Sequence, residues 1–192
     1  GCVVARSNEA KALGVPMGAP AFKYRDLFRQ HNIVQFSGSF ELYGDISKRI
    51  TALLSTITPR IEIYSVDESF LDVTTLSIKD YSEWGRIIKT TIQDTIGVPV
   101  SVGIGPTKTL AKLASEIAKQ DVGHQGAFSF IGLKEAKKAH IMGNIPVEDI
   151  WGVGRKLAPK VRAEGAGTAL ALANMRPQRA QQLMGVHGRQ MV

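Results

Sequence analysis

Two adjacent carboxylates, Asp67 and Glu68, have the chemistry best suited to hold a metal ion in this sequence. They lie between two strand-like runs, R-I-E-I-Y-S-V and S-F-L-D-V, whose alternation predicts a hairpin. Carboxylate oxygens suit Mg²⁺, and two such ions about 3.5–4 Å apart can activate an attacking hydroxyl and stabilise a leaving pyrophosphate. Apolar Val66 and Phe70 flank the pair, so we expect the carboxylates to project from a packed hairpin. The alternative is a pair of ordinary turn residues.

A second candidate is the segment G-I-G-P-T-K-T-L-A-K-L-A-S-E-I-A-K, in which a strand ends and a helix begins at Thr107. The N-terminus of a helix presents free N–H groups to a phosphate. At about 100° per residue, Lys112 and Lys119 fall within about 40° of Lys108, so the three lysines form one stripe opposite the apolar face. The alternative is the solvated face of an ordinary amphipathic helix. The spacing differs from the phosphate loop of nucleotide hydrolases.

A third candidate is the turn formed by Gly152, Val153 and Gly154, which lies between a short apolar helix and a basic one. Glycines allow backbone amides to approach a phosphate closely. The basic residues around the turn are Arg155, Lys156, Lys160 and Arg162. This pattern is typical of a helix-hairpin-helix, which binds a DNA backbone independently of base sequence. The alternative is a glycine-containing turn in a small helical bundle. Pro159 fits the second helix only in its first turn or at a kink.

The remaining reactive side chains do not form a recognisable site. No metal-ligand spacing relates the four histidines, which are His31, His124, His140 and His187. Cys2 has no partner histidine nearby in the sequence, so nothing supports a nucleophilic hydrolase. As the single cysteine, it also excludes an internal disulfide framework and favours a reducing, cytoplasmic compartment.

The composition is that of a soluble globular protein with a basic second half. The chain has 192 residues, of which 44% are hydrophobic, and no apolar run approaches the ~20 residues that span a bilayer. Residues 1–96 carry equal numbers of acidic and basic side chains, so the whole net charge of +7 lies in residues 97–192. This asymmetry favours a polyanionic partner such as nucleic acid over a merely solvated basic face.

The elements that must position these residues follow from periodicity and capping signals. We expect helices at 7–13, 23–30, 39–58, 79–96 and 107–119, and strands at 2–5, 33–36, 60–66, 69–73, 98–105 and 127–131. After about residue 132, short helices separated by glycines replace the strands. The central α-β-β-α-β order predicts an α+β, ferredoxin-like unit that lacks its first strand. That missing strand, and a chain beginning with Gly1, indicate a fragment.

Several segments together resemble the Y-family of translesion DNA polymerases, and within it the UmuC-like branch. They are G-C-V-V-A-R-S-N-E-A-K-A-L-G-V-P-M-G, E-L-Y-G-D-I-S-K-R-I, E-I-Y-S-V-D-E-S-F-L-D, V-G-I-G-P-T-K-T-L-A-K-L-A and D-I-W-G-V-G-R-K. They follow the family order along essentially the whole chain. The resemblance implies a partial fingers domain at 1–36, a ferredoxin-like palm at 37–131 and an all-α thumb with a helix-hairpin-helix at 132–192.

The resemblance also implies roles for individual residues. Asp67 and Glu68 match metal-binding carboxylates of the palm, whereas Lys119 and Lys11 match positions that contact the incoming triphosphate. Asn8 stands where many members carry tyrosine. The family's first metal-binding aspartate, and the aromatic residue that excludes ribose, would lie upstream of Gly1. The little finger and the clamp-binding motif would lie downstream, so the chain is expected to be an internal piece that is inactive alone.

The implied activity is error-prone extension of a primer opposite damaged template bases, as in SOS repair, with two Mg²⁺ ions as cofactors. The implied partners are primer–template DNA, dNTPs, a UmuD′-like accessory protein, RecA and a sliding clamp. A palm-type nucleotidyl cyclase is one alternative, but it predicts a G-G-D-E-F-like turn that this sequence lacks. A DNA-binding or regulatory fragment without catalysis is the other.

Overall fold

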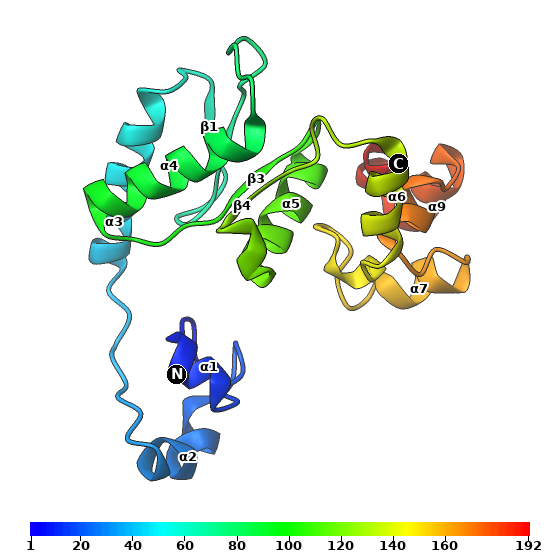
Figure 1. Cartoon of the computed structure of the whole chain (residues 1–192). Helices are drawn as coiled ribbons and strands as arrows, with labels where there is room; N and C mark the ends of the chain where they lie inside the picture. Colours follow the sequence, from blue (N-terminus) through cyan, green and yellow to red (C-terminus); the bar gives the residue numbers. More distant parts are fainter. The chain divides into compact units, whose positions relative to one another are not determined.

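The computed structural model describes residues 1–192, with the side chain of Val122 left out. Its internal contacts divide the chain into two compact units, Gly1–Ser47 and Lys48–Val192. Figure 1 shows the elements of both units in chain order. Each unit is described separately below.

The first unit contains three short helices. They are α1 (Asn8–Ala12), the 3₁₀ helix η1 (Ala21–Tyr24) and α2 (Arg25–Gln30). Ser7 caps α1, since its hydroxyl accepts the N–H of Ala10 at 3.2 Å. The expected strand at 2–5 is reduced to a single bridge between Cys2 and Pro20.

The expected strand at 33–36 was wrong. Residues 33–36 form neither helix nor strand, and Val34 and Phe36 are largely exposed. The apolar character of Ile33, Val34 and Phe36 is the only strand signal in the segment. In the structure, no neighbouring strand satisfies their backbone groups, which a stable strand requires.

The α-β-β-α-β order is confirmed in the middle of the chain. The elements are α3 (Phe40–Ser55), β1 (Ile61–Ile63), β2 (Ser69–Leu71), α4 (Tyr81–Ile96) and β3 (Val102–Ile104). β1 and β2 form the expected antiparallel hairpin, with Ile61 opposite Leu71. α4 begins at its cap Asp80 and ends at Gly97, which has φ +82°. The predicted end of this helix at Gly97 and the predicted strand pairing are confirmed, whereas the helix begins at Tyr81 and not at Lys79.

Three further elements complete this part of the fold. They are α5 (Lys108–Gln120), the 3₁₀ helix η2 (Val122–His124) and β4 (Ala127–Ser129), which pairs with β3 in parallel. Among the described residues the strands form two separate two-stranded sheets, because β2 and β3 do not pair with each other.

The two helices of the ferredoxin-like arrangement share one core with the strands. Leu54 of α3 and Ile88 and Ile92 of α4 are buried against Ile61 of β1 and Val102 of β3. The apolar spacing of residues 79–96 predicts that Ile87 points inward with Ile88 and Ile92, and this was wrong, because its side chain is 52% exposed. The inward face of α4 is instead centred on Gly85, Ile88 and Ile92.

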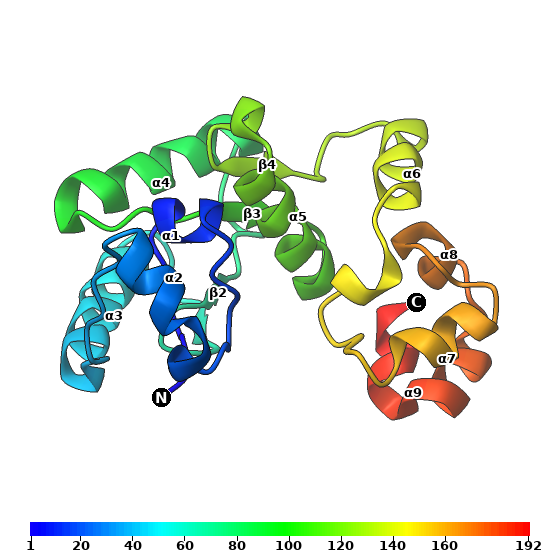
Figure 2. The same cartoon turned by 90° about the horizontal axis from the view of Figure 1, so that it is seen from below.

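α4 and α5 pack against opposite faces of the β3–β4 pair (Figure 2). Side chains of successive strand residues point to opposite faces. Val102 and Ile104 contact Gly85 of α4, whereas the residue between them, Gly103, faces the backbone of α5. A Cβ on Gly103 would overlap backbone atoms of Ala111 and Ser115. We therefore assign Gly103 to close strand–helix packing rather than to phosphate binding.

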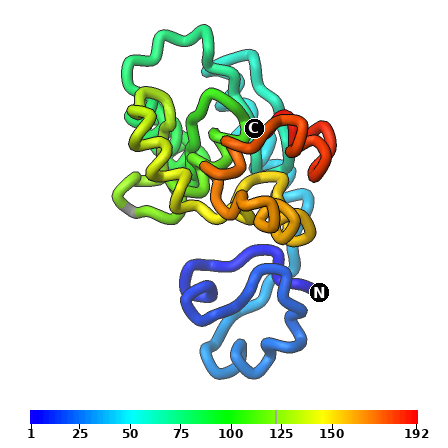
Figure 3. Tube along the Cα trace, turned by 90° about the vertical axis from the view of Figure 1, so that its right-hand side faces the viewer, coloured from blue at the N-terminus to red at the C-terminus, as the bar shows by residue number. Residues whose placement is uncertain are grey.

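The remaining residues form a group of short helices, as expected after residue 132 (Figure 3, yellow to red). They are α6 (Glu135–Gly143), the 3₁₀ helix η3 (Val147–Asp149), α7 (Ala158–Ala163), α8 (Ala169–Ala173) and α9 (Pro177–Met191). α9 is interrupted at Gly185, which has φ 71° and ψ −159°.

This helical group shares a core with α5 and β4. Val147, Val153 and Val161 are fully buried in the same cluster as Leu113 and Phe130. The shared apolar core stabilises the position of the helices against the face of α5 that points away from its lysines.

Candidate active site and nucleic-acid interface

Asp67 and Glu68 lie in the five-residue loop, Tyr64–Glu68, that joins β1 to β2. The carbonyl of Glu68 accepts the N–H groups of both Tyr64 and Ser65 at 3.0 Å, which closes the loop. The Ser65 hydroxyl donates to Oδ1 of Asp67 at 2.6 Å. The loop therefore holds both carboxylates at one end of the hairpin.

The expectation that these carboxylates project from a packed hairpin needs correction. Val66, on which that expectation relied, is 55% exposed, and Asp67 is exposed beside it. Glu68 is half-buried. The loop is ordered by its backbone hydrogen bonds and by partners on α5, not by burial of its own apolar residue.

Two lysines of α5 pair with carboxylates of the hairpin. Lys112 forms an ion pair with Glu68, and Lys108 forms one with Glu62. The side chains of Lys112 and Glu68 are 19% and 36% exposed, so this pair is the more shielded of the two. Thr107 begins the helix as expected, since its hydroxyl accepts the N–H of Leu110 at 3.2 Å. The predicted lysine stripe thus supplies counter-charge to the predicted metal-binding loop.

Lys119 lies on the same stripe but does not contact the hairpin in the structure. Its Nζ is 3.7 Å from Glu116 of the same helix, and its side chain is 62% exposed. In the first unit, Lys11 donates to Oδ1 of Asn8 at 3.4 Å, so α1 presents both residues together. These three residues remain candidates for binding a triphosphate.

The predicted glycine turn lies between the three-residue 3₁₀ helix η3 and α7. Gly152 has φ +93°, a conformation that other residues rarely adopt, and Val153 is buried beneath the turn. The carbonyl of Gly154 accepts the N–H groups of Leu157 and Ala158. Pro159 is the second residue of α7, where its missing N–H costs no helical hydrogen bond.

The basic residues of this turn differ in their availability. Arg155, Lys156 and Lys160 are exposed, and none of the three forms an ion pair within the part of the chain that the structure describes. Arg162, in contrast, pairs with Glu148 of η3. The pKa of Glu148 is lowered, first by a hydrogen bond from its own backbone and then by Arg162. Three cations therefore remain available to a polyanion.

An aromatic cluster that the sequence did not reveal joins the hairpin to the glycine turn. The rings of Tyr64 and Phe70 lie 5.3 and 5.7 Å from that of Trp151, and 5.9 Å from each other. Lys108 Nζ lies 5.4 Å from the centre of the Phe70 ring. Spacing along the chain carries no signal for a contact between residues 64 and 151, which only the fold brings together.

The donor chemistry of the loop suits Mg²⁺ in part. Mg²⁺ is commonly bound through one or two carboxylates together with water and substrate phosphates, and Asp67 and Glu68 supply two such carboxylates. No group of three or more metal-binding side chains is found among the described residues. These residues therefore fit an ion that arrives with further ligands, such as the phosphates of a nucleotide.

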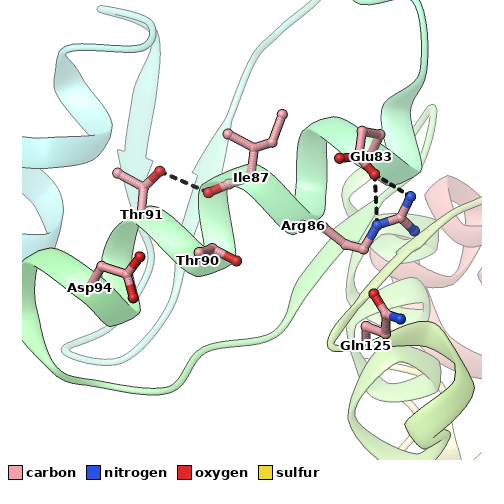
Figure 4. Close-up of a pocket in the computed structure, with 7 residues that line it drawn as sticks. All are labelled: Glu83, Arg86, Ile87, Thr90, Thr91, Asp94 and Gln125. Atoms are coloured by element: carbon pink, nitrogen blue, oxygen red, sulfur yellow. Dashed lines mark hydrogen bonds and ion pairs between the residues drawn. The ribbon is translucent and has the colours of Figure 1, made fainter.

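A surface hollow of about 420 Å³ lies elsewhere, along α4 (Figure 4). Its lining includes the ion pair between Glu83 and Arg86, and the exposed side chain of Ile87. None of the predicted site residues lines it. It therefore gives no reason to move the candidate site away from the hairpin. Among the described residues, no helix combines the length and apolarity needed to cross a bilayer.

Comparison with known proteins identifies relatives along most of the chain. The family described as "impB/mucB/samB family" matches residues 1–116. The chain is 42% identical over 175 residues to Protein UmuC of Salmonella typhimurium, covering 90% of this chain and 41% of that protein. It is 29% identical over 189 residues to DNA polymerase IV of Oceanobacillus iheyensis, covering 98% and 43%. The chain thus spans less than half the length of these relatives.

Solved structures show the same fold. A structure titled "Dbh Ternary Complex (substrates partially disordered)" superposes with a TM-score of 0.80 at 24% identity, covering all of this chain and 55% of that one. A structure of DinB from Sulfolobus solfataricus gives a TM-score of 0.72 at 23% identity, covering 95% and 52%. At these identities the likeness establishes the α+β fold.

Proposed function

The chain belongs to the impB/mucB/samB family, and from this premise we propose that it is part of a Y-family translesion DNA polymerase. In this proposal residues 1–36 are a partial fingers domain, residues 37–131 the palm and residues 132–192 the thumb. The observation that supports this proposal most strongly is that two candidate sites lie close together in the second unit. The carboxylate loop packs, through α5 and Trp151, beside a helix-hairpin-helix that has three available cations.

The palm residues would bind the reacting groups. Asp67 and Glu68 would hold Mg²⁺, two ions in the intact enzyme, which lowers the cost of the negative charge that develops in phosphoryl transfer. Lys112 would orient the Glu68 carboxylate through their ion pair. Lys119, Lys11 and Asn8 would bind the triphosphate of the incoming dNTP through charge and hydrogen bonds.

The thumb residues would hold the primer–template duplex. The turn at Gly152 and Gly154 brings backbone N–H groups to the surface, and Arg155, Lys156 and Lys160 would neutralise phosphates. Such contacts position a duplex without reading its bases, which suits an enzyme that must accept damaged templates. A UmuD′-like protein, RecA, a sliding clamp and a cytoplasmic location belong to the proposal through the family resemblance.

The alternative is a DNA-binding or regulatory module without catalysis. It is favoured by one observation, that Asp67 and Glu68 form no larger cluster of metal-binding side chains among the described residues. Both functions predict that duplex DNA binds, so binding alone does not separate them.

Primer extension separates them. Single-nucleotide incorporation would be measured for the 192-residue chain and for the full-length protein from the same gene, each with Mg²⁺ and with EDTA. We expect Mg²⁺-dependent incorporation by the full-length protein and none by the 192-residue chain. Asp67→Ala in the full-length protein is the matched control and should abolish incorporation while DNA binding persists. Equal incorporation by Asp67→Ala and the parent would overturn the catalytic assignment.

A further inference from the structure

We propose that Trp151 is a positioning residue that couples binding of a DNA backbone at the glycine turn to the geometry of the carboxylate loop. The inference rests on the proposed function, because it concerns how the two parts of that site communicate. It assigns a role to a residue that is neither a predicted metal ligand nor a predicted phosphate-binding cation.

Trp151 lies between the two parts of the site in both sequence and space. It immediately precedes Gly152, the residue with φ +93° that opens the turn leading to Arg155. Its ring lies 5.3 Å from that of Tyr64, the first residue of the carboxylate loop, in an edge-to-face arrangement. A displacement of the glycine turn on binding phosphates therefore moves a ring that packs on the loop.

The contact reaches both ends of the loop. Tyr64 precedes the carboxylates, and Phe70, whose ring lies 5.7 Å from that of Trp151, follows them by two residues. Edge-to-face and offset ring pairs favour particular geometries, so the three rings constrain the hairpin more tightly than apolar contact alone. The N–H of Tyr64 donates to the carbonyl of Glu68, which links the ring cluster to a predicted metal ligand through one hydrogen bond.

Hydrogen exchange provides a readout that does not depend on catalysis. The amides of Tyr64 and Ser65 both donate to Glu68, so their exchange reports on closure of the carboxylate loop. In the full-length protein, we expect saturating duplex DNA to slow exchange of these two amides. In Trp151→Ala, DNA should bind within about threefold of the parental Kd but should no longer slow their exchange.

The same variant should show a selective kinetic defect. At saturating DNA and dNTP, we expect Trp151→Ala to incorporate a nucleotide about three- to tenfold more slowly, the effect of losing one or two aromatic pairs. Trp151→Phe retains a ring and should restore both the rate and the DNA-linked protection. Tyr64→Leu removes the opposite ring at a half-exposed position and should reproduce the defect even if Trp151→Ala folds poorly.

Trp84 of α4 is the matched control, because it packs on the separate core around Leu54 and Ile92. Trp84→Ala should lower the melting temperature but leave the DNA-linked protection of Tyr64 and Ser65 unchanged. If the parent binds duplex DNA without slowing these amides, or if Trp151→Ala and Tyr64→Leu retain the protection, the coupling is overturned and the proposed function stands. If the parent does not bind duplex DNA, the proposed function fails and the coupling fails with it.

Discussion

Replacing Asp67 and Glu68 separately should give the same loss of catalysis but different losses of stability. Asp67 is exposed and accepts one hydrogen bond from a neighbouring serine, so Asp67→Ala should change the free energy of unfolding by less than about 0.5 kcal/mol. Glu68 pairs with Lys112, whose side chain is only 19% exposed. Removing Glu68 leaves that ammonium shielded from water without its partner.

The size of this second effect lies between two known limits. Exposed ion pairs contribute about 0–1 kcal/mol, whereas breaking a fully buried pair costs about 3–5 kcal/mol. Because Glu68 itself is 36% exposed, solvent screens the pair, and we expect Glu68→Ala to cost about 1 kcal/mol. The melting temperature of Glu68→Ala should therefore be lower than that of Asp67→Ala. The loss of either predicted metal ligand should slow incorporation at least about a hundredfold.

The neighbouring ion pair between Glu62 and Lys108 is the matched control. It joins the same hairpin to the same helix, but its side chains are 50% or more exposed and it contains no predicted metal ligand. Glu62→Ala should therefore leave the incorporation rate nearly unchanged. Melting curves and single-nucleotide incorporation would be measured for all three variants of the full-length protein. A lowered melting temperature with near-normal incorporation in Asp67→Ala would show that the loop residues are structural.

Three further changes test other parts of the structure. Replacing Arg155 and Lys156 by Ala should flatten the slope of log K against log salt for duplex binding by about one to two units for unrelated sequences, whereas Arg162→Ala, already paired with Glu148, should flatten it less. Gly103→Ala should destabilise the fold by several kcal/mol, because the added Cβ overlaps the backbone of α5. Gly154→Ala is the control, because a Cβ there enters open space, and melting curves of the two variants would be compared. A hydrogen bond from Arg179 lowers the pKa of Glu164 below its usual value of 4.5. The ion pair of these two residues therefore stabilises the folded state above pH 4.5, and this stabilisation is lost as the pH falls further. Glu164→Gln should therefore lower the melting temperature at pH 7 and match the parent in acid.

Features that depend on local signals were predictable from the sequence. The cap at Thr107, the end of α4 at Gly97 and the place of Pro159 in the first turn of α7 each require only a few neighbouring residues. The hairpin was predictable for the same reason, since its two strands are close in the chain. The helical character of residues 132–192 followed from their glycine spacing.

Features that depend on distant partners were not predictable. The ion pairs of Lys108 and Lys112 join residues more than 40 positions apart, and a lysine stripe in the sequence looks the same whether it faces solvent or a carboxylate loop. The segment at 33–36 shows the converse error, because a short apolar run was assigned to a strand for which the fold supplies no partner. A site predicted from separate sequence motifs therefore lacks the long-range contacts that hold those motifs together in the structure.

The helix α5 supplies that relation, because its different faces carry different parts of the site. One face presents Lys108 and Lys112 to the hairpin, and another buries Leu113 and Ala118 in the core shared with the helical group. A rigid helix fixes the angle between its faces. Because α5 contacts the hairpin with one face and the helical group with another, it holds the carboxylate loop and the glycine turn at a fixed distance. The ring of Trp151 provides a second connection, because it packs directly on the ring of Tyr64 in the loop. Two independent connections between the same pair of segments restrict rotation as well as separation, which the proposed alignment of a primer end with a nucleotide requires.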